Sequence, residues 1–298
     1  MKECRFAVIP AKAVLHTTPA DRPTAVWRAG IQSRQHLWTP AFAGVTSWGL
    51  ILTLMVPFAS VYADYHPIEV THGGTIRGLV KFPSETPPRA MFANQGDARC
   101  PRGIPQDHLI VKQETRGIQN ALVILDIERG KPLPLVKVQL DNKGCRFVPR
   151  IQWAPRHGSL QLVNSDPAPH NVHAYREDTT VFSVDLPVGG SPVRRPLVAS
   201  GLHKINCDYH LWTRAWVYVS EHPYVAVTDA EGRFELTDIP PGTYTLRAWH
   251  EGWIEKGTEK TGQPYLAPMT DVRRVAVRRD RVTDVLLDTL EPAFLYSR

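Results

Sequence analysis

Three side chains that ligate soft metals occur in two short segments of the chain. Cys207 and His210 stand in the segment NCDYHLWT, and His170 stands earlier, in the segment PHNVH. A thiolate and two imidazoles form a trigonal set of sulfur and nitrogen donors, and such a set suits both Cu(I) and Cu(II). The sequence therefore predicts a site for one copper ion at His170, Cys207 and His210.

The spacing of these residues suits presentation from strand ends. Two residues separate Cys207 from His210, so a single loop can turn both side chains inward at the end of a strand. His170 follows the stretch NSDPAP, whose prolines end the preceding strand and stiffen the approach. His173, three residues past His170, could be a further ligand, but because two imidazoles already flank the thiolate we expect it to be a partly exposed strand histidine. We also expect structural roles for His203, His222 and His250.

Motifs for catalysis are missing from the sequence. It contains no Gly-x-Ser-x-Gly elbow, no glycine loop of the kind that cradles phosphates and no His-Glu-x-x-His zinc pattern. Asp229, Glu231 and Glu235 fall within an expected hairpin, where turn and solvated-face roles account for them. We therefore expect that the protein is not an enzyme.

The cysteines stand at positions 4, 100, 145 and 207. In an oxidising compartment Cys100 and Cys145 can pair, which leaves Cys207 as an odd thiol. An unpaired thiol in an exported protein calls for a reason, and metal ligation supplies one. The rival pairing of Cys145 with Cys207 would destroy the metal site.

The N-terminal segment is typical of an exported protein. Residues 48–59, WGLILTLMVPFA, are an apolar run of twelve, too short for a stable span and of the length found in signal peptides. Residues 60–63, SVYA, offer small side chains at the cleavage positions. We expect residues 1–63 to be a leader cleaved after Ala63, leaving a periplasmic or otherwise exported chain without a membrane span. The alternative is an uncleaved anchor.

The net charge of +6 could indicate nucleic acid or an anionic surface as a partner. Residues 1–63, however, contain six basic and two acidic side chains, so the rest of the chain carries only +2. We therefore expect no nucleic acid among the partners of the mature chain.

Composition and pattern predict an all-β fold. The chain holds 26 prolines and 20 glycines, and short alternating segments follow one another without an amphipathic helical period. Such closely spaced strands indicate antiparallel sandwiches or barrels. The turn DAEG at 229–232 predicts a hairpin between its flanking strands. The expected strands are residues 74–82, 118–127, 136–140, 150–154, 159–164, 180–184, 201–205, 216–219, 224–228, 233–236, 242–250, 274–277 and 282–287.

Two segments near the C-terminus carry a resemblance to a known domain. VTDAEGRF at 227–234 and IPPGTY at 239–244 resemble the second half of a transthyretin-like β-domain of the carboxypeptidase-regulatory type. Residues 74–82 and 121–125 resemble its first half. The resemblance implies a transthyretin-like β-sandwich with a first part at 72–135, an inserted domain at 136–221 and a second part at 222–290.

The inserted segment carries the motifs PHNVH and Cys-x-x-His as a pair. Together they resemble the small blue-copper proteins of the amicyanin kind in the cupredoxin family. The resemblance implies a cupredoxin-like antiparallel sandwich with His170, Cys207 and His210 as copper ligands. It also implies that Asn171 braces the ligand loops through hydrogen bonds.

One position departs from the family pattern. Thr213 stands where the family has a weak axial methionine. The fourth position is then empty, filled by a backbone oxygen or open to water, and its identity tunes the reduction potential.

Three functions follow from these features. The leading one is single-electron transfer between a redox partner protein, such as a dehydrogenase or cytochrome, and an acceptor. The second is copper sequestration or delivery with a copper-handling partner, which a missing axial ligand would help. The third is a β-sandwich binding module with a degenerate metal site. An apolar rim at Trp212 and Trp216 would suit docking, although we expect Trp216 to lie in the core and leave Trp212 open.

Overall fold

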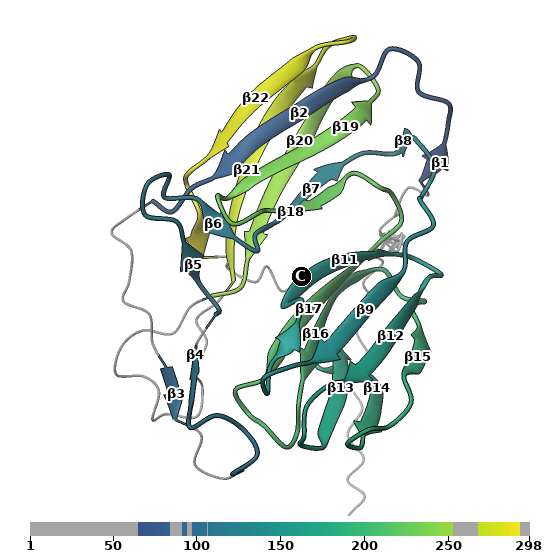
Figure 1. The fold of residues 1–298 in the computed structure, drawn as a ribbon. Coiled ribbons are helices and arrows are strands. Elements are labelled where there is room, and N and C mark those ends of the chain that lie inside the picture. The colour runs from purple at the N-terminus through teal and green to yellow at the C-terminus, as the bar shows by residue number, and fades with distance from the viewer. Residues whose placement is uncertain (1–64, 84–90, 94–96, 106, 253–267, 293–298) are drawn as a thin grey trace, which may run out of the picture. The chain divides into compact units, whose positions relative to one another are not determined.

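The computed structural model describes residues 65–83, 91–93, 97–105, 107–252 and 268–292. These residues form strands, turns and irregular segments, so the predicted all-β fold class is confirmed (Figure 1). The described residues include no helix that is long and apolar enough to cross a membrane. The expected leader at residues 1–63 lies outside the described residues.

The strands are short and follow one another closely, as the spacing of turn residues predicts. Their bounds are β1 His66–Pro67, β2 Gly74–Val80, β3 Met91–Ala93, β4 Gly103–Pro105, β5 Ile110–Val111, β6 Ile118–Gln119, β7 Leu122–Asp126, β8 Arg129–Gly130, β9 Val138–Asn142, β10 Phe147–Val148, β11 Ile151–Pro155, β12 Ser159–Asn164, β13 His170–Arg176, β14 Thr179–Leu186, β15 Val193–Pro196, β16 Gly201–Asn206, β17 Arg214–Ser220, β18 Val225–Val227, β19 Arg233–Ile239, β20 Gly242–His250, β21 Met269–Val277, β22 Val282–Leu287 and β23 Glu291–Pro292.

The strands from β9 to β17 form two sheets, with strand orders β10-β9-β12-β15 and β11-β17-β16-β13-β14. Alternate side chains of both sheets, among them Leu140, Leu162, Val172 and Val217, form one buried cluster between them. The pairs β9–β12 and β11–β17 are parallel, so the sandwich expected to be antiparallel contains two parallel pairs beside its antiparallel ones. These paired strands are not joined by a tight turn, so no hairpin sets their direction.

Two further sheets, with orders β18-β7-β20-β21-β23 and β19-β2-β22, combine strands that precede β9 with strands that follow β17. Their shared core buries Ile76, Leu125, Tyr224 and Leu246. Burial of such side chains contributes about 1.5–3 kcal/mol each to stability. The expected domain boundaries themselves stay a prediction.

The hairpin predicted around residues 229–232 is wrong. The turn itself is present, since the N–H of Gly232 donates to the carbonyl of Asp229 at 3.0 Å. However, β18 pairs with β7 and β19 pairs with β2, so the turn carries the chain from one sheet to the other. The strand expected at 118–127 is also divided into β6 and β7, at Asn120 with its positive φ of 64°.

A partly buried ion pair joins the residue before β11 to the residue after β20. Arg150 contacts the carboxylate of Glu251 through two nitrogens, with Nη2 at 2.9 Å from Oε2, and Trp216 Nε1 donates to Oε2 at 3.0 Å. The ring of Trp216 also meets that of Trp249 edge-on. The expectation that Trp216 lies in the core is therefore wrong. It is half-buried on the outer face of β17, because its neighbour Val217 occupies the inner face.

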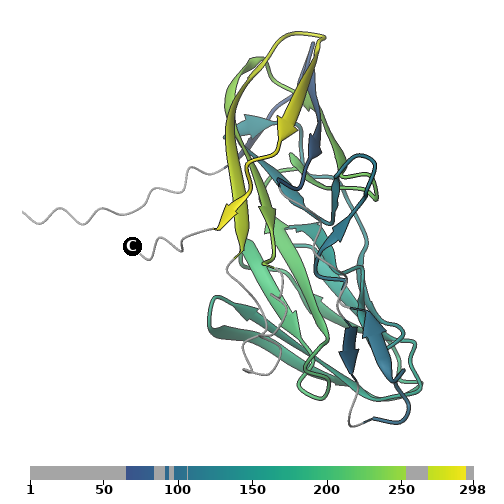
Figure 2. The ribbon, with the colours of Figure 1, turned by 90° about the vertical axis from the view of Figure 1, so that its left-hand side faces the viewer.

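The strands β21 and β22 (yellow) meet at the turn of residues 278–281, at the top of Figures 1 and 2. β21 belongs to the five-stranded sheet and β22 to the three-stranded sheet. This connection therefore also carries the chain from one sheet to the other. β22 is an edge strand of its sheet.

Candidate metal centre

Strand alternation directs His170 and Cys207 toward the same interior. In β13 the side chains of Val172 and Ala174 are buried in the core, so His170, on the same face, also points inward. In β16 the side chain of Ile205 is buried, and Cys207 follows two residues later on that face. Because β13 and β16 are antiparallel neighbours, the start of one strand lies beside the end of the other.

His210 is positioned by the loop that follows β16. Two backbone hydrogen bonds close this loop: the N–H of Thr213 donates to the carbonyl of His210 at 2.8 Å, and the N–H of Cys207 donates to the carbonyl of Thr213 at 3.2 Å. Only 2% of the surface of His210 is exposed. The loop therefore turns the imidazole into the protein.

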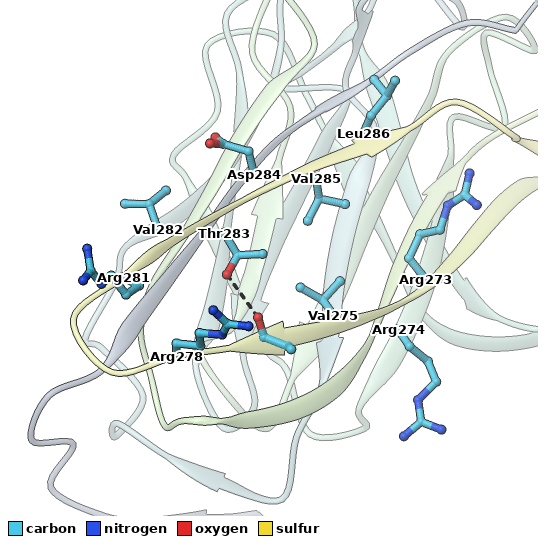
Figure 3. Close-up of a pocket in the computed structure, with 11 residues that line it drawn as sticks. Arg273, Arg274, Val275, Arg278, Arg281, Val282, Thr283, Asp284, Val285 and Leu286 are labelled. Carbon is cyan, nitrogen blue, oxygen red and sulfur yellow. Dashed lines mark hydrogen bonds between the residues drawn. The ribbon is translucent and has the colours of Figure 1, made fainter.

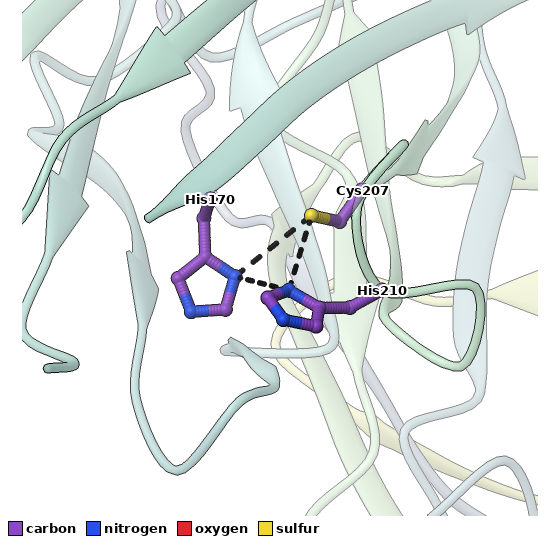
Figure 4. A group of neighbouring side chains, drawn as sticks. All are labelled: His170, Cys207 and His210. Atoms are coloured by element: carbon purple, nitrogen blue, oxygen red, sulfur yellow. Dashed lines mark hydrogen bonds between the residues drawn. The ribbon is translucent and has the colours of Figure 1, made fainter. Parts of the chain in front are cut away.

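Three potential ligand atoms face one another in Figure 4. Sγ of Cys207 lies 3.8 Å from Nδ1 of His170 and 3.6 Å from Nδ1 of His210, and the two Nδ1 atoms are 3.1 Å apart. Metal bonds of about 2.3 Å to sulfur and about 2.0 Å to nitrogen, in a trigonal arrangement, separate sulfur from nitrogen by about 3.7 Å and the nitrogens by about 3.5 Å. The three buried side chains therefore form a triangle that fits one metal ion.

Each imidazole has a carboxylate on its far side. Nε2 of His170 lies 2.9 Å from Oδ2 of Asp166, and Nε2 of His210 lies 3.3 Å from Oδ2 of Asp97. Because an ionised carboxylate only accepts, these contacts assign a proton to each Nε2 and leave a lone pair on each Nδ1. Two lone pairs on nitrogens 3.1 Å apart repel each other unless a cation lies between them, either a metal ion or a proton.

Asp166 is itself held by the backbone. Its carboxylate accepts the N–H of Gly144 at 2.6 Å and the N–H of Cys145 at 2.8 Å, and its own N–H donates to the side chain of Asn164. Asp166 is also buried. A fixed carboxylate behind a ligating imidazole sets the orientation of the ring, as in known metal sites.

Burial shifts the pKa values of His170 and Cys207. It lowers the pKa of His170, and the neighbouring His210 lowers that pKa further. Burial also raises the pKa of the Cys207 thiol. The backbone N–H of Asn171, which donates to Sγ of Cys207 at 3.4 Å, opposes this effect and lowers that pKa. The site thus offers a neutral imidazole at His170 and a thiol whose ionisation needs a cation nearby.

Asn171 links the ligand strand to its neighbour. Its backbone N–H reaches Cys207, and its side-chain Nδ2 donates to Oγ of Ser183 and Oδ1 of Asp185, both at 3.0 Å. Ser183 and Asp185 belong to β14, so Asn171 ties β13 to β14 beside the thiol.

Cys100 and Cys145 are joined by a disulfide, and Cys207 is a free, buried thiol. Two further groups of potential ligands among the described residues each contain one of the disulfide sulfurs, which cannot act as thiolates while they are joined. The hydroxyl of Thr213 and Nε1 of Trp212 both donate to the carbonyl of Cys145 at 3.0 Å. The loop after Cys207 is therefore anchored to the disulfide.

A cavity of about 370 Å³ opens beside His210. Arg99 donates to the carboxylate of Asp97 through its side chain and its backbone N–H, which holds the pKa of Asp97 well below its usual range. Trp212 is half-buried, with its ring centroid 5.1 Å from that of His210. The lining residues are Asp97, Arg99, Pro169, Tyr209, His210 and Trp212.

The other histidines lie outside the triangle. His173 points from the opposite face of β13, where its Nδ1 lies 2.9 Å from Oδ2 of Asp208 and its ring stacks on Tyr175. Within the described part of the chain, no group of potential ligands includes His173, His203, His222 or His250.

Sequence reasoning missed the two carboxylates. Asp166 had a local signal, because it stands four residues before His170 in a Pro- and Asn-containing turn. Asp97 had none, since 113 positions separate it from His210.

Comparisons with known proteins give partial matches. The sequence profile of the family described as polysaccharide lyase family 4, domain II, matches residues 198–262, which is well under half of the chain. No curated protein matches the chain significantly.

Several solved structures are similar to part of the chain. A purple cupredoxin from Nitrosopumilus maritimus is 21% identical, with 28% of this chain and 100% of that chain covered and a TM-score of 0.26. A copper-containing nitrite reductase from Thermus scotoductus SA-01 is 19% identical, with 31% of this chain and 24% of the reductase covered and a TM-score of 0.27. Amicyanin from Paracoccus versutus is 14% identical, with 33% of this chain and 97% of amicyanin covered and a TM-score of 0.26. The match spans about a quarter of the nitrite reductase, and each likeness is confined to about a third of this chain or less.

Proposed function

We propose that the protein is an exported copper-binding protein that transfers single electrons through a type-1-like site formed by His170, Cys207 and His210. The observation that supports this function is the convergence of one buried sulfur and two imidazole nitrogens, with a carboxylate behind each ring. Thiolate and imidazole donors together suit both oxidation states of copper.

The residues around the site would limit its rearrangement. Bound copper would supply a one-electron couple at this position. Asp166 and Asp97 would keep the imidazole rings from rotating by accepting their Nε2 protons, and the N–H of Asn171 would stabilise the thiolate. Rigid ligands lower the reorganisation that accompanies a change of charge, so this arrangement favours electron transfer.

Copper sequestration or delivery is the second candidate function. It is favoured by the cavity beside His210, which would give a copper-handling partner a route to the site. It is also favoured by Thr213, which replaces an axial methionine and whose hydroxyl is engaged with the carbonyl of Cys145.

The remaining features of the proposal concern location and partners. We infer export from the apolar run at residues 48–59 and from the disulfide between Cys100 and Cys145, since disulfides persist in oxidising compartments. We infer a redox partner such as a dehydrogenase or cytochrome, and no catalytic turnover of a substrate. Tyr209 and Leu211 are 53% and 85% exposed beside the site and would be the apolar part of the docking surface.

Copper titration followed by visible and electron paramagnetic resonance spectra tests the proposal. We expect one copper ion per chain, an intense thiolate-to-copper band, loss of that band in Cys207→Ser and its retention in the control His173→Gln. A reversible one-electron couple would favour electron transfer, whereas rapid passage of Cu(I) to a chelator would favour delivery. Absence of the band from the copper-loaded protein would contradict the electron-transfer function.

A further inference from the structure

The edges of β21 and β22 leave backbone groups without a neighbouring strand. β22 is the last strand of its sheet and pairs only with β2 within the described residues. β21 pairs with β20 along its whole length, but on its other side it pairs with β23 only at Met269 and Thr270. The rest of that edge of β21, and the outer edge of β22, are therefore open among the described residues.

The two open edges face a shared groove. Arg281 and Leu287 direct their carbonyls toward β2, so the alternate residues Val282, Asp284 and Leu286 direct their N–H and C=O groups to the other side. The hydroxyl of Thr283 donates to the carbonyl of Ala276 at 3.1 Å, the dashed line in Figure 3, so that carbonyl of β21 points toward β22. A groove of about 800 Å³ lies along these two strands.

Positive charge is concentrated in this groove. Four arginines line it: Arg273, Arg274, Arg278 and Arg281 (Figure 3). Arg273 is compensated by Asp271 and Asp288. The other three are exposed, and no carboxylate of the described residues forms an ion pair with them. Among the described residues that line the groove, Asp284 is the one acid, and it is paired with Arg77.

The groove is also lined by exposed apolar side chains of β22. Val282 is 53% exposed and Leu286 is 47% exposed, on the same side of β22 as Asp284. The groove thus combines free strand edges, exposed apolar side chains and three guanidinium groups. Guanidinium groups bind carboxylates in a paired, directional geometry.

Charged side chains on an edge strand commonly prevent association between copies of one chain. The three arginines would repel the same edge of a second copy, so they disfavour self-association. They do not disfavour an extended segment of opposite charge. Addition of a strand to a free sheet edge is a recurrent mode of peptide recognition.

We propose that the groove between β21 and β22 binds an extended, acidic segment of a partner protein, which adds as a strand beside β22. The backbone groups of Val282, Asp284 and Leu286 would pair with the segment. Arg274, Arg278 and Arg281 would select for its carboxylates.

The test uses a fluorescent peptide of alternating Glu and Val, as long as the six residues of β22, and measures its anisotropy on titration with the purified protein. We expect saturable binding that weakens by about tenfold or more in the triple variant Arg274→Ser, Arg278→Ser, Arg281→Ser. The matched control, Arg176→Ser, Arg194→Ser, Arg195→Ser, also removes three arginines outside the groove and should bind as the unmodified protein does.

A second peptide keeps the charges but replaces each Val with Pro, which removes backbone donors. We expect it to bind at least about tenfold more weakly, and this comparison leaves the protein unaltered. Equal binding of the two peptides, or equal displacement of the first by a DNA duplex, would show general polyanion attraction and overturn the proposal. Self-association of the protein that the triple variant abolishes would also overturn it, in favour of a second copy as the occupant.

Discussion

At the scale of single residues, the imidazoles of His170 and His210 are oriented by carboxylates that do not belong to the candidate ligand set. Asp166 accepts hydrogen bonds from the His170 ring and from two backbone N–H groups. This carboxylate therefore links the orientation of one ligand to the turn before β13. Carboxylates in this position affect metal affinity although they do not touch the metal.

Asp166→Asn should weaken copper binding by about 10–100-fold, because the amide is a poorer acceptor for the proton on His170 Nε2. Competition with a chelator of known affinity measures the change. Asp141→Asn is the matched control, since Asp141 accepts hydrogen bonds from Ser165 in the same turn but contacts no ligand. Equal losses in both variants would contradict a specific role for Asp166.

At the scale of elements, the disulfide connects the loop that carries Asp97 to the segment that holds Asp166. Cys100 follows Asp97 by three residues, and the N–H of Cys145 donates to Asp166. The carbonyl of Cys145 accepts from Trp212 and Thr213 in the ligand loop. One cross-link thereby supports both carboxylates and the loop of His210.

Replacement of both Cys100 and Cys145 by Ala should lower the free energy of unfolding by about 4 kcal/mol, the chain-entropy value for a closed loop of this length. The cysteines are 45 positions apart. Urea unfolding of the copper-free protein measures the loss, and unmodified protein under reducing conditions is the control, with a similar decrease expected. No decrease in either sample would contradict a stabilising role for the disulfide.

At the scale of the whole molecule, several histidines are buried in the neutral form. Burial lowers the pKa of His108, His222 and His250 to about 4. Burial by itself would raise the pKa of Glu251, but the charge and hydrogen bond of Arg150, together with Trp216 and His250, outweigh burial and lower that pKa. The folded state therefore keeps neutral imidazoles near an ionised carboxylate.

Stability of the copper-free protein should fall as the pH decreases from about 6.5, the usual histidine pKa, to about 4. In that window the histidines of the unfolded chain bind protons, whereas the buried histidines of the folded protein stay neutral. The free energy of unfolding therefore falls by at most about 1.4 kcal/mol per pH unit for each histidine. Urea unfolding at a series of pH values measures the slope. His222→Leu should reduce it, and His66→Gln, at an exposed position, should not. An unchanged slope in His222→Leu would contradict this account.

The sequence by itself determined the features that depend on near neighbours. Alternation predicted the strands and the all-β class, and the two-residue spacing of Cys207 and His210 predicted one loop with two inward side chains. These inferences hold because the direction of a side chain depends on a few adjacent backbone angles.

Only the tertiary structure decided which strands pair and what surrounds the ligands. It separated β18 from β19, made β11 and β17 parallel, moved Trp216 out of the core and brought Asp97 to His210. The pairing of β11 with β17 and the contact of Asp97 with His210 each close a long stretch of chain. Such closure depends on the packing of the whole molecule, which no local pattern in the sequence records.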